Sequence, residues 1–263
     1  MVSLENNSAI KKPFADRVMR LAGEIGVRLI KNGAEIYRVE ESLTIVISAY
    51  GMQNVKIFAL PSLIIIRFEC FGAVHSDQFR LKGGSVNLDK LERLNALCRR
   101  INEGDYSIDE AEKTLDDIIN RKKYPLSITH LAYGFVGFFY TLFWGGKLID
   151  AVVAFLCALI IRTVVLFSEK LKTNLLFSNI SAGLFLGFFP FIVRLIYPVV
   201  DMDKIIIGVI MLLVPGIAIA NVMRDVIVGD TYSALLRFTQ ILTIGVGLAI
   251  GVAIPLALLG GAL

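Results

Sequence analysis

Apolar positions in the first 123 residues follow the periods of short helices and strands. Helical spacing over 14–29, 35–50, 88–101 and 108–121 predicts four helices. Apolar runs at 54–60, 62–70 and 77–82 predict three strands between the second and third helices. We therefore predict a small α+β domain over residues 1–123, with the element order ααβββαα.

From residue 124 onward the pattern changes to long apolar runs that contain few charges. A helix needs about 20 mostly apolar residues to cross a bilayer. The runs predict five transmembrane helices, at about 127–146, 149–168, 174–197, 204–223 and 236–260. Residues 124–263 are therefore predicted to form an α-helical polytopic membrane domain.

Composition supports this division of the chain. Of its 263 residues 56% are hydrophobic, and the mean hydropathy is +0.69. A soluble domain is about 45–50% apolar, so a purely soluble enzyme is not expected. Residues 1–127 carry 36 charged side chains and residues 128–263 carry 14. The net charge of +4 is too small and too dispersed to indicate a nucleic-acid partner.

Basic residues near the ends of the predicted spans give an orientation. Lys147 and Lys204 lie on one side of the membrane, and seven basic residues lie on the other. These seven are Arg121, Lys122, Lys123, Lys170, Lys172, Arg224 and Arg237. Because Lys and Arg collect on the cytoplasmic side, we expect a cytoplasmic α+β domain and an external C-terminus. The first residues, MVSLENNSAIKKPF, lack an apolar run, so no cleavable signal peptide is expected.

The sequence offers little for an enzyme or a cofactor. Its three cysteines and two histidines have no CxxC or HxxxH spacing, so neither a metal nor another cofactor is predicted. A GxSxG elbow and a P-loop are also missing from the sequence, so we predict neither a membrane enzyme nor ATP-driven transport.

Helix breakers and polar side chains at membrane depth are the candidates for a transport path. Pro215 and Gly216 lie within the fourth predicted span, where they indicate either a broken helix or a simple kink. Arg162, Asn179 and Asn221 also lie inside predicted spans, and such groups usually face a bundle interior or a wet cavity.

Glycine pairs at GxxxG spacing occur in the third and fifth predicted spans. Gly183 and Gly187 form one pair, and Gly247 and Gly251 form the other. This spacing lets two helix backbones approach closely, and ordinary helix packing is the interpretation we favour.

Two charged segments are candidates for gating. Arg224, Asp225, Asp230 and Arg237 lie between the fourth and fifth spans, where they form either an inner gate that handles a coupling proton or an ordinary charged loop. In the α+β domain the segment NGAEIYRVEES at 32–42 contains Glu35, Tyr37, Arg38 and Glu41. Glu35, Arg38 and Glu41 share one helix face, which is typical of a solvated salt-bridge surface or of a contact surface for gating, assembly or regulation.

Two segments resemble the threonine/serine exporter family of the ThrE type. They are NGAEIYRVEESLTIVISAYG at 32–51 and LLVPGIAIANVMRDVIVGDTYSALLRFTQ at 212–240. The similarity extends over most of residues 14–260. It implies a secondary exporter of threonine and serine that uses the proton gradient in the bacterial inner membrane. It also favours the gate interpretation of the charged loop.

The resemblance also implies a partner. Single-chain members of the family carry a second membrane module, whereas this chain ends after its fifth predicted span. It therefore resembles the longer subunit of the split, two-subunit form. That form implies a second small membrane subunit in a hetero-oligomer. It also implies a dicarboxylate, succinate in particular, as an alternative small carboxylate substrate.

Other functional classes remain open at the level of sequence. A membrane-anchored sensor or scaffold needs only one or two spans, and five spans with an internal arginine argue against it. A channel would need a ring of carboxylates or carbonyls, which is not evident in the sequence but which oligomeric symmetry can create.

Overall fold

The computed structural model describes residues 2–122, 124–171 and 173–259, with side chains between residues 13 and 258. The described residues form two compact units. The first unit contains residues up to Lys122 together with Ile217–Arg237, and the second contains 124–216 and the residues from Phe238 on. The segment 217–237, which we had assigned to the membrane domain, thus packs with the N-terminal residues.

The N-terminal part of the first unit has the predicted order of elements. The elements are α1 (Val2–Lys31), α2 (Ile36–Ala49), β1 (Gln53–Leu60), β2 (Leu63–Cys70), β3 (Ala73–Arg80), α3 (Leu88–Asn102) and α4 (Ile108–Asn120). The prediction for the third strand, 77–82, was wrong at its start. Phe71 and Gly72 both have positive φ and form a tight two-residue turn, so β3 begins directly after it.

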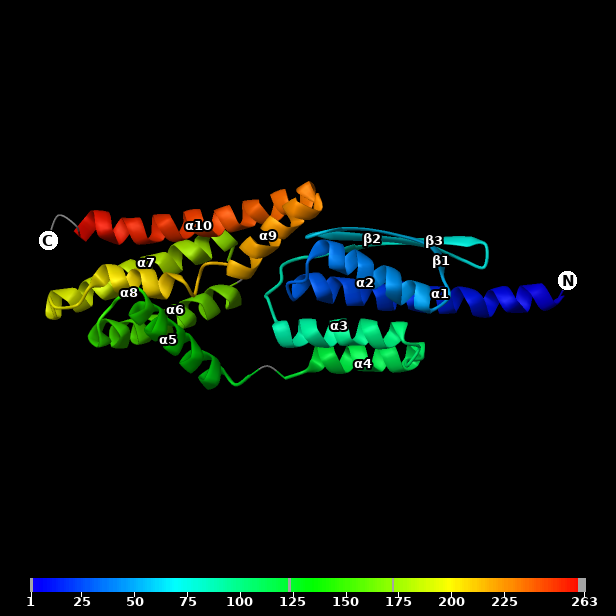
Figure 1. Cartoon of the computed structure of the whole chain (residues 1–263), viewed down its shortest axis with the longest axis horizontal. Helices are drawn as coiled ribbons and strands as arrows, with labels where there is room; N and C mark the ends of the chain where they lie inside the picture. Colours follow the sequence, from blue (N-terminus) through cyan, green and yellow to red (C-terminus); the bar gives the residue numbers. More distant parts are fainter. Residues whose placement is uncertain (1, 123, 172, 260–263) are drawn as a thin grey trace. The chain divides into compact units, whose positions relative to one another are not determined.

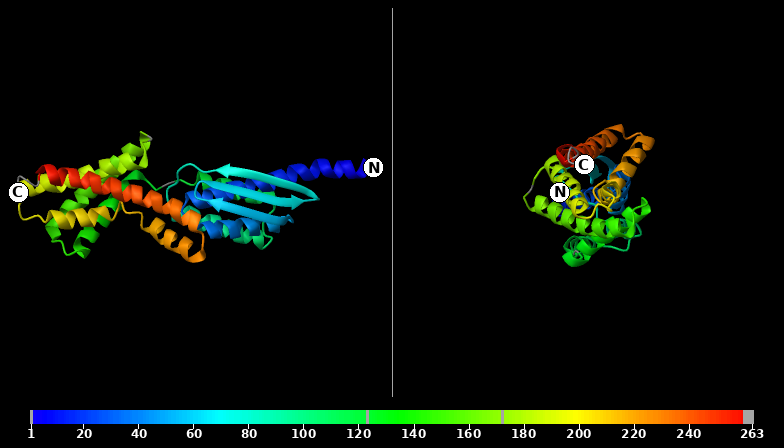
Figure 2. Two further views of the ribbon diagram at one scale, coloured as in Figure 1. Left: turned by 90° about the horizontal axis from the view of Figure 1, so that it is seen from above. Right: turned by 90° about the vertical axis from the view of Figure 1, so that its left-hand side faces the viewer.

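The three strands form an antiparallel sheet in the order β1-β2-β3, and Figure 2 shows them side by side. In Figure 1 the helices α1 and α2 lie between this sheet and the pair α3 and α4. Ile64, Ile66 and Phe68 are fully buried in the core, whereas Ile65 between them is exposed. This alternation follows from the two-residue period of a strand, and it turns one face of the sheet toward α1 and α2.

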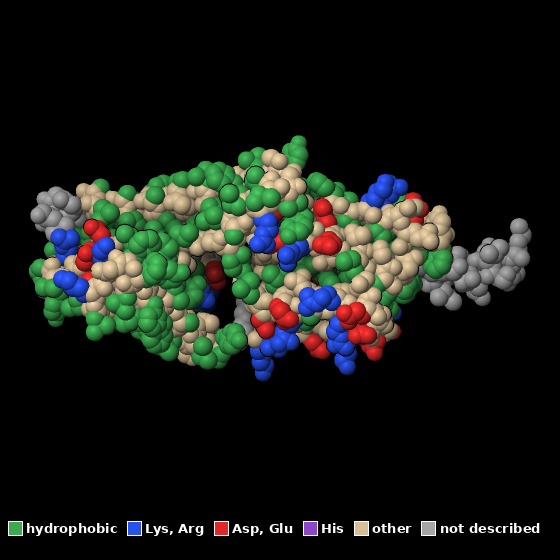
Figure 3. Space-filling view, viewed as in Figure 1, with side chains coloured by type: hydrophobic (Ala, Val, Ile, Leu, Met, Phe, Trp, Pro, Cys, Tyr) green, Lys and Arg blue, Asp and Glu red, His purple; other side chains and the backbone are tan. Residues whose placement is uncertain are grey.

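Within the residues that the structure describes, four helices are long and apolar enough to span a membrane. They are α5 (Leu126–Phe143), α6 (Leu148–Lys170), α7 (Leu175–Ile196) and α10 (Thr231–Leu259). They correspond to four of the five predicted spans, although α10 begins five residues before its predicted start. Figure 3 shows apolar side chains covering much of the second unit's visible surface, whereas charged side chains gather over α3 and α4.

The predicted span 204–223 is not one helix. It is divided into α8 (Met202–Ile210) and α9 (Gly216–Val228), with a turn over 211–213 and a bend at 214 between them. Pro215 explains the interruption, because proline has no N–H to donate and its ring clashes with the preceding helical turn. The helix is therefore broken, and not merely kinked, before Gly216. In contrast, α7 continues through Pro190.

The two GxxxG pairs pack against each other. A Cβ added to Gly183 of α7 would lie 2.8 Å from the Leu248 carbonyl oxygen and 2.9 Å from the Gly251 Cα of α10. A Cβ added to Gly247 of α10 would lie 3.0 Å from the Leu176 carbonyl oxygen of α7. The glycines therefore allow close packing of α7 on α10, as the spacing predicts.

Candidate functional site

Buried polar side chains of the first unit gather where the loop between α1 and α2 meets α9 and the start of α10. They come from two segments that are almost 200 positions apart in the sequence. Each is at most 9% exposed: Asn32, Glu35, Asn221, Asp225, Ser233 and Arg237. We call this group the polar cluster. Buried polar groups are costly without partners, so their contacts define what the cluster does.

The loop offers two backbone carbonyls to the cluster. Helix α1 ends at Asn32-Gly33, where Gly33 takes a φ of +101° that glycine adopts without strain. Asn221 Nδ2 donates a hydrogen bond to the Gly33 carbonyl at 3.1 Å. Arg237 Nη2 donates to the Ala34 carbonyl at 2.8 Å. Side chains of α9 and α10 thus fix the position of the chain as it leaves α1.

Glu35 lies between two guanidinium groups. Its Oε1 accepts a hydrogen bond from Arg224 of α9, and its Oε2 lies 3.0 Å from Arg38 Nε. The Glu35 side chain is 11% exposed, whereas those of Arg224 and Arg38 are 51% and 61% exposed. The i,i+3 pair with Arg38 had been expected. Because Glu35 is buried and pairs with Arg224 of α9, this helix face is a contact surface and not simply a solvated salt-bridge surface.

Asp225 is the most deeply buried carboxylate of the cluster, at 1% exposure. Its Oδ2 lies 3.4 Å from Arg237 Nε, and neither carboxylate oxygen accepts a hydrogen bond from a described residue. Burial raises the pKa of Asp225, Arg237 opposes this rise, and Asp230 adds to it. A carboxyl group with these surroundings is suited to binding and releasing a proton.

The predicted gate residues do not all pair with one another. Asp225 pairs with Arg237, but Arg224 pairs with Glu35 instead. Asp230 accepts a hydrogen bond from the Ser233 backbone N–H at 3.3 Å, so it caps α10. Asn221, which we had placed on the membrane path, belongs to the polar cluster.

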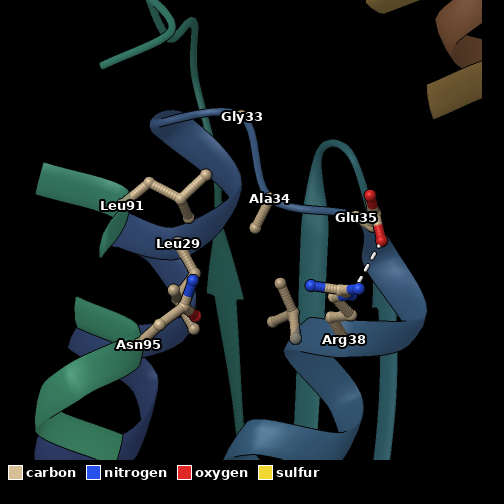
Figure 4. Close-up of a pocket in the computed structure, with 8 residues that line it drawn as sticks. Leu29, Gly33, Ala34, Glu35, Arg38, Leu91 and Asn95 are labelled. Atoms are coloured by element: carbon tan, nitrogen blue, oxygen red, sulfur yellow. Dashed lines mark ion pairs between the residues drawn. The ribbon is translucent and has the colours of Figure 1, made fainter. Parts of the chain in front are cut away.

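A cavity of about 60 Å³ adjoins the loop between α1 and α2. In Figure 4 Glu35 and Arg38 lie on one side of it, and Leu29, Leu91 and Asn95 lie on the other. Tyr37 and Glu41, the other residues of the charged segment at 32–42, do not line this cavity but a larger groove between α2 and α3.

The sequence from residue 20 to residue 259 matches the ThrE family, whose description reads "Putative threonine/serine exporter". The chain belongs to this family. It is also 25% identical over 251 residues to a threonine/serine exporter of Corynebacterium glutamicum, a match that covers 92% of this chain and 51% of that protein. The chain thus spans about half the length of this relative. No solved structure matches it.

The match to the ThrE family covers both segments of the polar cluster. Membership of an exporter family, together with four apolar helices, makes the chain a multi-pass membrane protein. Among the residues that the structure describes, no group of three or more potential metal ligands occurs.

In the second unit of this ThrE-family chain, Arg162 of α6 faces Tyr133 of α5. Its guanidinium carbon lies 4.6 Å from the Tyr133 ring centroid, and its Nη1 donates to the Tyr133 hydroxyl at 3.4 Å. The Arg162 Nε is buried without a hydrogen-bond partner among the described residues. Arg162 is thus half-buried and retains a buried donor, its Nε, that no described residue uses.

Asn179 and Gly216 make contacts that differ from those of Arg162. The Asn179 Nδ2 donates to the Leu175 carbonyl of its own helix at 2.7 Å, next to Gly247 of α10. At Gly216 an added Cβ would meet no atom within 4 Å. The structure therefore keeps these predicted path residues in the second unit but gives them separate contacts.

Two polar side chains of the second unit, Tyr133 and Asp150, were not predicted to make the contacts that the structure shows. Nothing in the sequence except its aromatic ring in a predicted span indicated that Tyr133 contacts Arg162. Asp150 is fully buried and accepts hydrogen bonds from the backbone N–H of Lys147 and of Asp201, at 2.8 and 2.9 Å. Its place in the first turn of α6 was a detectable capping signal, because carboxylates favour helix N-termini.

Proposed function

We propose that this ThrE-family chain is a subunit of a secondary exporter that moves threonine- and serine-type amino acids out of the cell. The observation that carries the proposal is the family match over residues 20–259. The named activity of the Corynebacterium relative supports the same substrates. Because the chain spans about half of that relative, a second membrane subunit or a second copy completes the transporter.

The interrupted segment between α7 and α10 supplies the route. In the orientation given by the basic residues, α5 leaves the cytoplasmic side, α6 returns to it and α7 leaves it again. The start of α10 packs with the first unit, so the chain between α7 and α10 crosses the membrane once more. This crossing is the fourth and α10 makes the fifth, so in the proposed orientation the N-terminus is cytoplasmic and the C-terminus lies outside.

That crossing contains a stretch of non-helical backbone. At 1.5 Å per residue, α8 extends about 14 Å, or about half of a hydrocarbon core of about 30 Å. The remainder falls to residues 211–216 and the first turns of α9. Irregular backbone at membrane depth is tolerated only where it is buried in protein or lines a wet cavity. The N–H groups of Leu212, Leu213, Val214 and Gly216 already donate to backbone carbonyls. The donor that we assign to a carboxylate substrate is therefore the guanidinium of Arg162.

Asp225 is the proposed site of proton coupling. It combines a buried carboxylate, a raised pKa and a cation, Arg237, whose Nε lies 3.4 Å from the carboxylate. The pairs Glu35–Arg224 and Asp225–Arg237 then form the inner gate. The first joins the segment after α1 to α9, and the second joins α9 to α10. Protonation of Asp225 weakens its attraction to Arg237 and loosens this connection.

The test is counterflow of labelled serine, threonine and succinate in proteoliposomes. The chain is reconstituted alone and together with a short hydrophobic protein encoded beside it, if one exists. We expect accumulation of serine and threonine, and its loss in Arg224→Gln and Asp225→Asn variants that still insert into the membrane. Accumulation of succinate alone would replace the amino-acid assignment with the dicarboxylate one. Full counterflow by both variants would contradict the gate.

A further inference from the structure

The groove between α2 and α3 has a size and a charge pattern that the export route does not use. Its volume is about 370 Å³, within the usual range of small-ligand sites. Helix α2 contributes Tyr37, Arg38 and Glu41 to its wall, and α3 contributes Asn95, Arg99 and Asn102. All of these side chains belong to the first unit.

Two opposite charges in this groove have no ion-pair partner. Within the described residues, no carboxylate lies within 4 Å of Arg99, and no cation lies within 4 Å of Glu41. The neighbouring arginines of α3 differ, since Arg93 lies 3.2 Å from Asp89 and Arg100 lies 3.6 Å from Asp105. Arg99 and Glu41 are both exposed at the groove, and neither has the ion-pair partner that Arg93 and Arg100 have.

The other side chains that line the groove are uncharged, except Arg38, which is paired with Glu35. Cys98 is buried in the groove wall, and burial raises the pKa of its thiol to about 12, so it stays uncharged at neutral pH. The amides of Asn95 and Asn102 and the hydroxyl of Tyr37 offer both donors and acceptors. A ligand that satisfies this groove therefore needs one anionic and one cationic group with polar atoms between them.

We propose that the α2–α3 groove binds a small polar α-amino acid, with its carboxylate at Arg99 and its ammonium group at Glu41. A dicarboxylate bound at Arg99 would direct its second anionic group either toward Glu41, where like charges repel, or toward Arg38, which is already paired with Glu35. The groove is thus a binding site outside the membrane route, selective for zwitterions.

The groove is connected to the polar cluster through Arg38. Arg38 lines both the groove and the adjoining cavity of about 60 Å³, and it pairs with Glu35, which in turn binds Arg224. A carboxylate entering the groove competes with Glu35 for Arg38. By linkage, ligand binding and the Glu35 contacts must then influence each other reciprocally. This regulatory role rests on the proposed export function, whereas the binding itself does not.

The test is isothermal titration of the full chain in lipid nanodiscs with L-serine, succinate and ethanolamine. We expect saturable binding of L-serine and much weaker binding of the other two, which each lack one of the two charges. Arg99→Gln is expected to weaken L-serine binding about tenfold or more, as the loss of a charge-assisted hydrogen bond does. Glu35→Gln is expected to tighten it several-fold, because Arg38 is released from competition.

The matched control is Arg100→Gln on the same helix, whose guanidinium lies 4.5 Å from the Tyr106 ring. It should leave the affinity unchanged. Asn102→Ala provides a second groove variant if Arg99→Gln unfolds. Hydrogen exchange should slow in peptides of α2 and α3 when L-serine binds. Equal affinities in the Arg99→Gln and Arg100→Gln variants, or no L-serine binding, would overturn the proposal.

Counterflow by the same protein in proteoliposomes separates this proposal from the export function. A chain that binds L-serine in the groove but fails to transport it supports the groove and contradicts the exporter. A chain that transports L-serine while Arg99→Gln binds it normally contradicts the groove alone.

Discussion

Arg237 donates a hydrogen bond from Nη2 to the backbone carbonyl of Ala34, 203 positions earlier in the chain, at 2.8 Å. The same guanidinium lies beside the buried carboxylate of Asp225. A single side chain at the start of α10 therefore holds both the loop after α1 and an acidic residue of α9. This arrangement is the basis of the gate that we propose, and it makes Arg237 the most informative residue to change.

Replacing Arg237 by Leu should destabilise the first unit strongly. The change leaves Asp225 buried without its cation and leaves the Ala34 carbonyl without its donor. Breaking a buried ion pair from one side costs about 3–5 kcal/mol. We expect this loss in the free energy of unfolding of the detergent-solubilised chain, followed by circular dichroism. Arg93→Gln, which removes an exposed pair, should cause no measurable change. Similar stability of both variants would contradict the burial of the pair.

Asp225 should give the chain a characteristic pH dependence of stability. A carboxyl group whose pKa is raised on folding favours the folded state when it is protonated. Its contribution is therefore present below the unfolded pKa, near 3.8, and is lost as the pH rises through the raised value.

We thus expect the Tm of the wild-type chain to fall more between pH 4 and pH 7 than that of Asp225→Asn. Tm measured in parallel for both proteins checks this, because other titrating groups contribute equally to the two. Parallel Tm profiles would show that Asp225 keeps an ordinary pKa.

The packing of α7 on α10 should depend on Gly251 and not on Gly245. A Cβ at Gly251 would overlap the Ile180 carbonyl and lie 2.8 Å from the Gly183 Cα, whereas one at Gly245 would meet no atom within 4 Å. Gly251→Ala should cost about 1–3 kcal/mol through overpacking. Gly245→Ala should be neutral or slightly stabilising. Unfolding in mixed detergent micelles measures both, and equal effects would contradict this packing.

Arg162 should be needed for transport but not for insertion. Arg162→Gln keeps a polar group next to Tyr133 but removes the positive charge that we assign to a substrate carboxylate. We expect counterflow to fall at least tenfold while the protein remains in the membrane fraction. Tyr133→Phe removes only a long hydrogen bond, so it should retain most of the activity. Wild-type rates in Arg162→Gln would exclude it from the route.

Local patterns in the sequence were sufficient to predict most elements of the fold. The order ααβββαα, the four long apolar helices and the GxxxG packing all follow from periodicity and composition. The start of β3 did not, because it depends on Phe71 and Gly72 adopting positive φ. The break before Gly216 was left open between two interpretations, since a proline in a helix can produce either one.

Local sequence patterns could not predict how the residues of the polar cluster pair. Glu35, Arg224, Asp225 and Arg237 were all recognised as candidates, but the pairing of Glu35 with Arg224 spans 189 positions. Sequence proximity instead suggested that the charges of the loop before α10 pair with one another. One local signal was available: Asn221 and Asp225 are four residues apart, so they share a helix face, and both are buried there.

The most direct test of the gate is a double-mutant cycle on Glu35 and Arg224, measured as the initial rate of serine counterflow in proteoliposomes. If the two side chains act as one pair, Glu35→Gln and Arg224→Gln should each reduce the rate. The double variant should then be no slower than the slower single variant. If the losses instead multiply in the double variant, the two residues act independently, and the account of a gate built on this pair is contradicted.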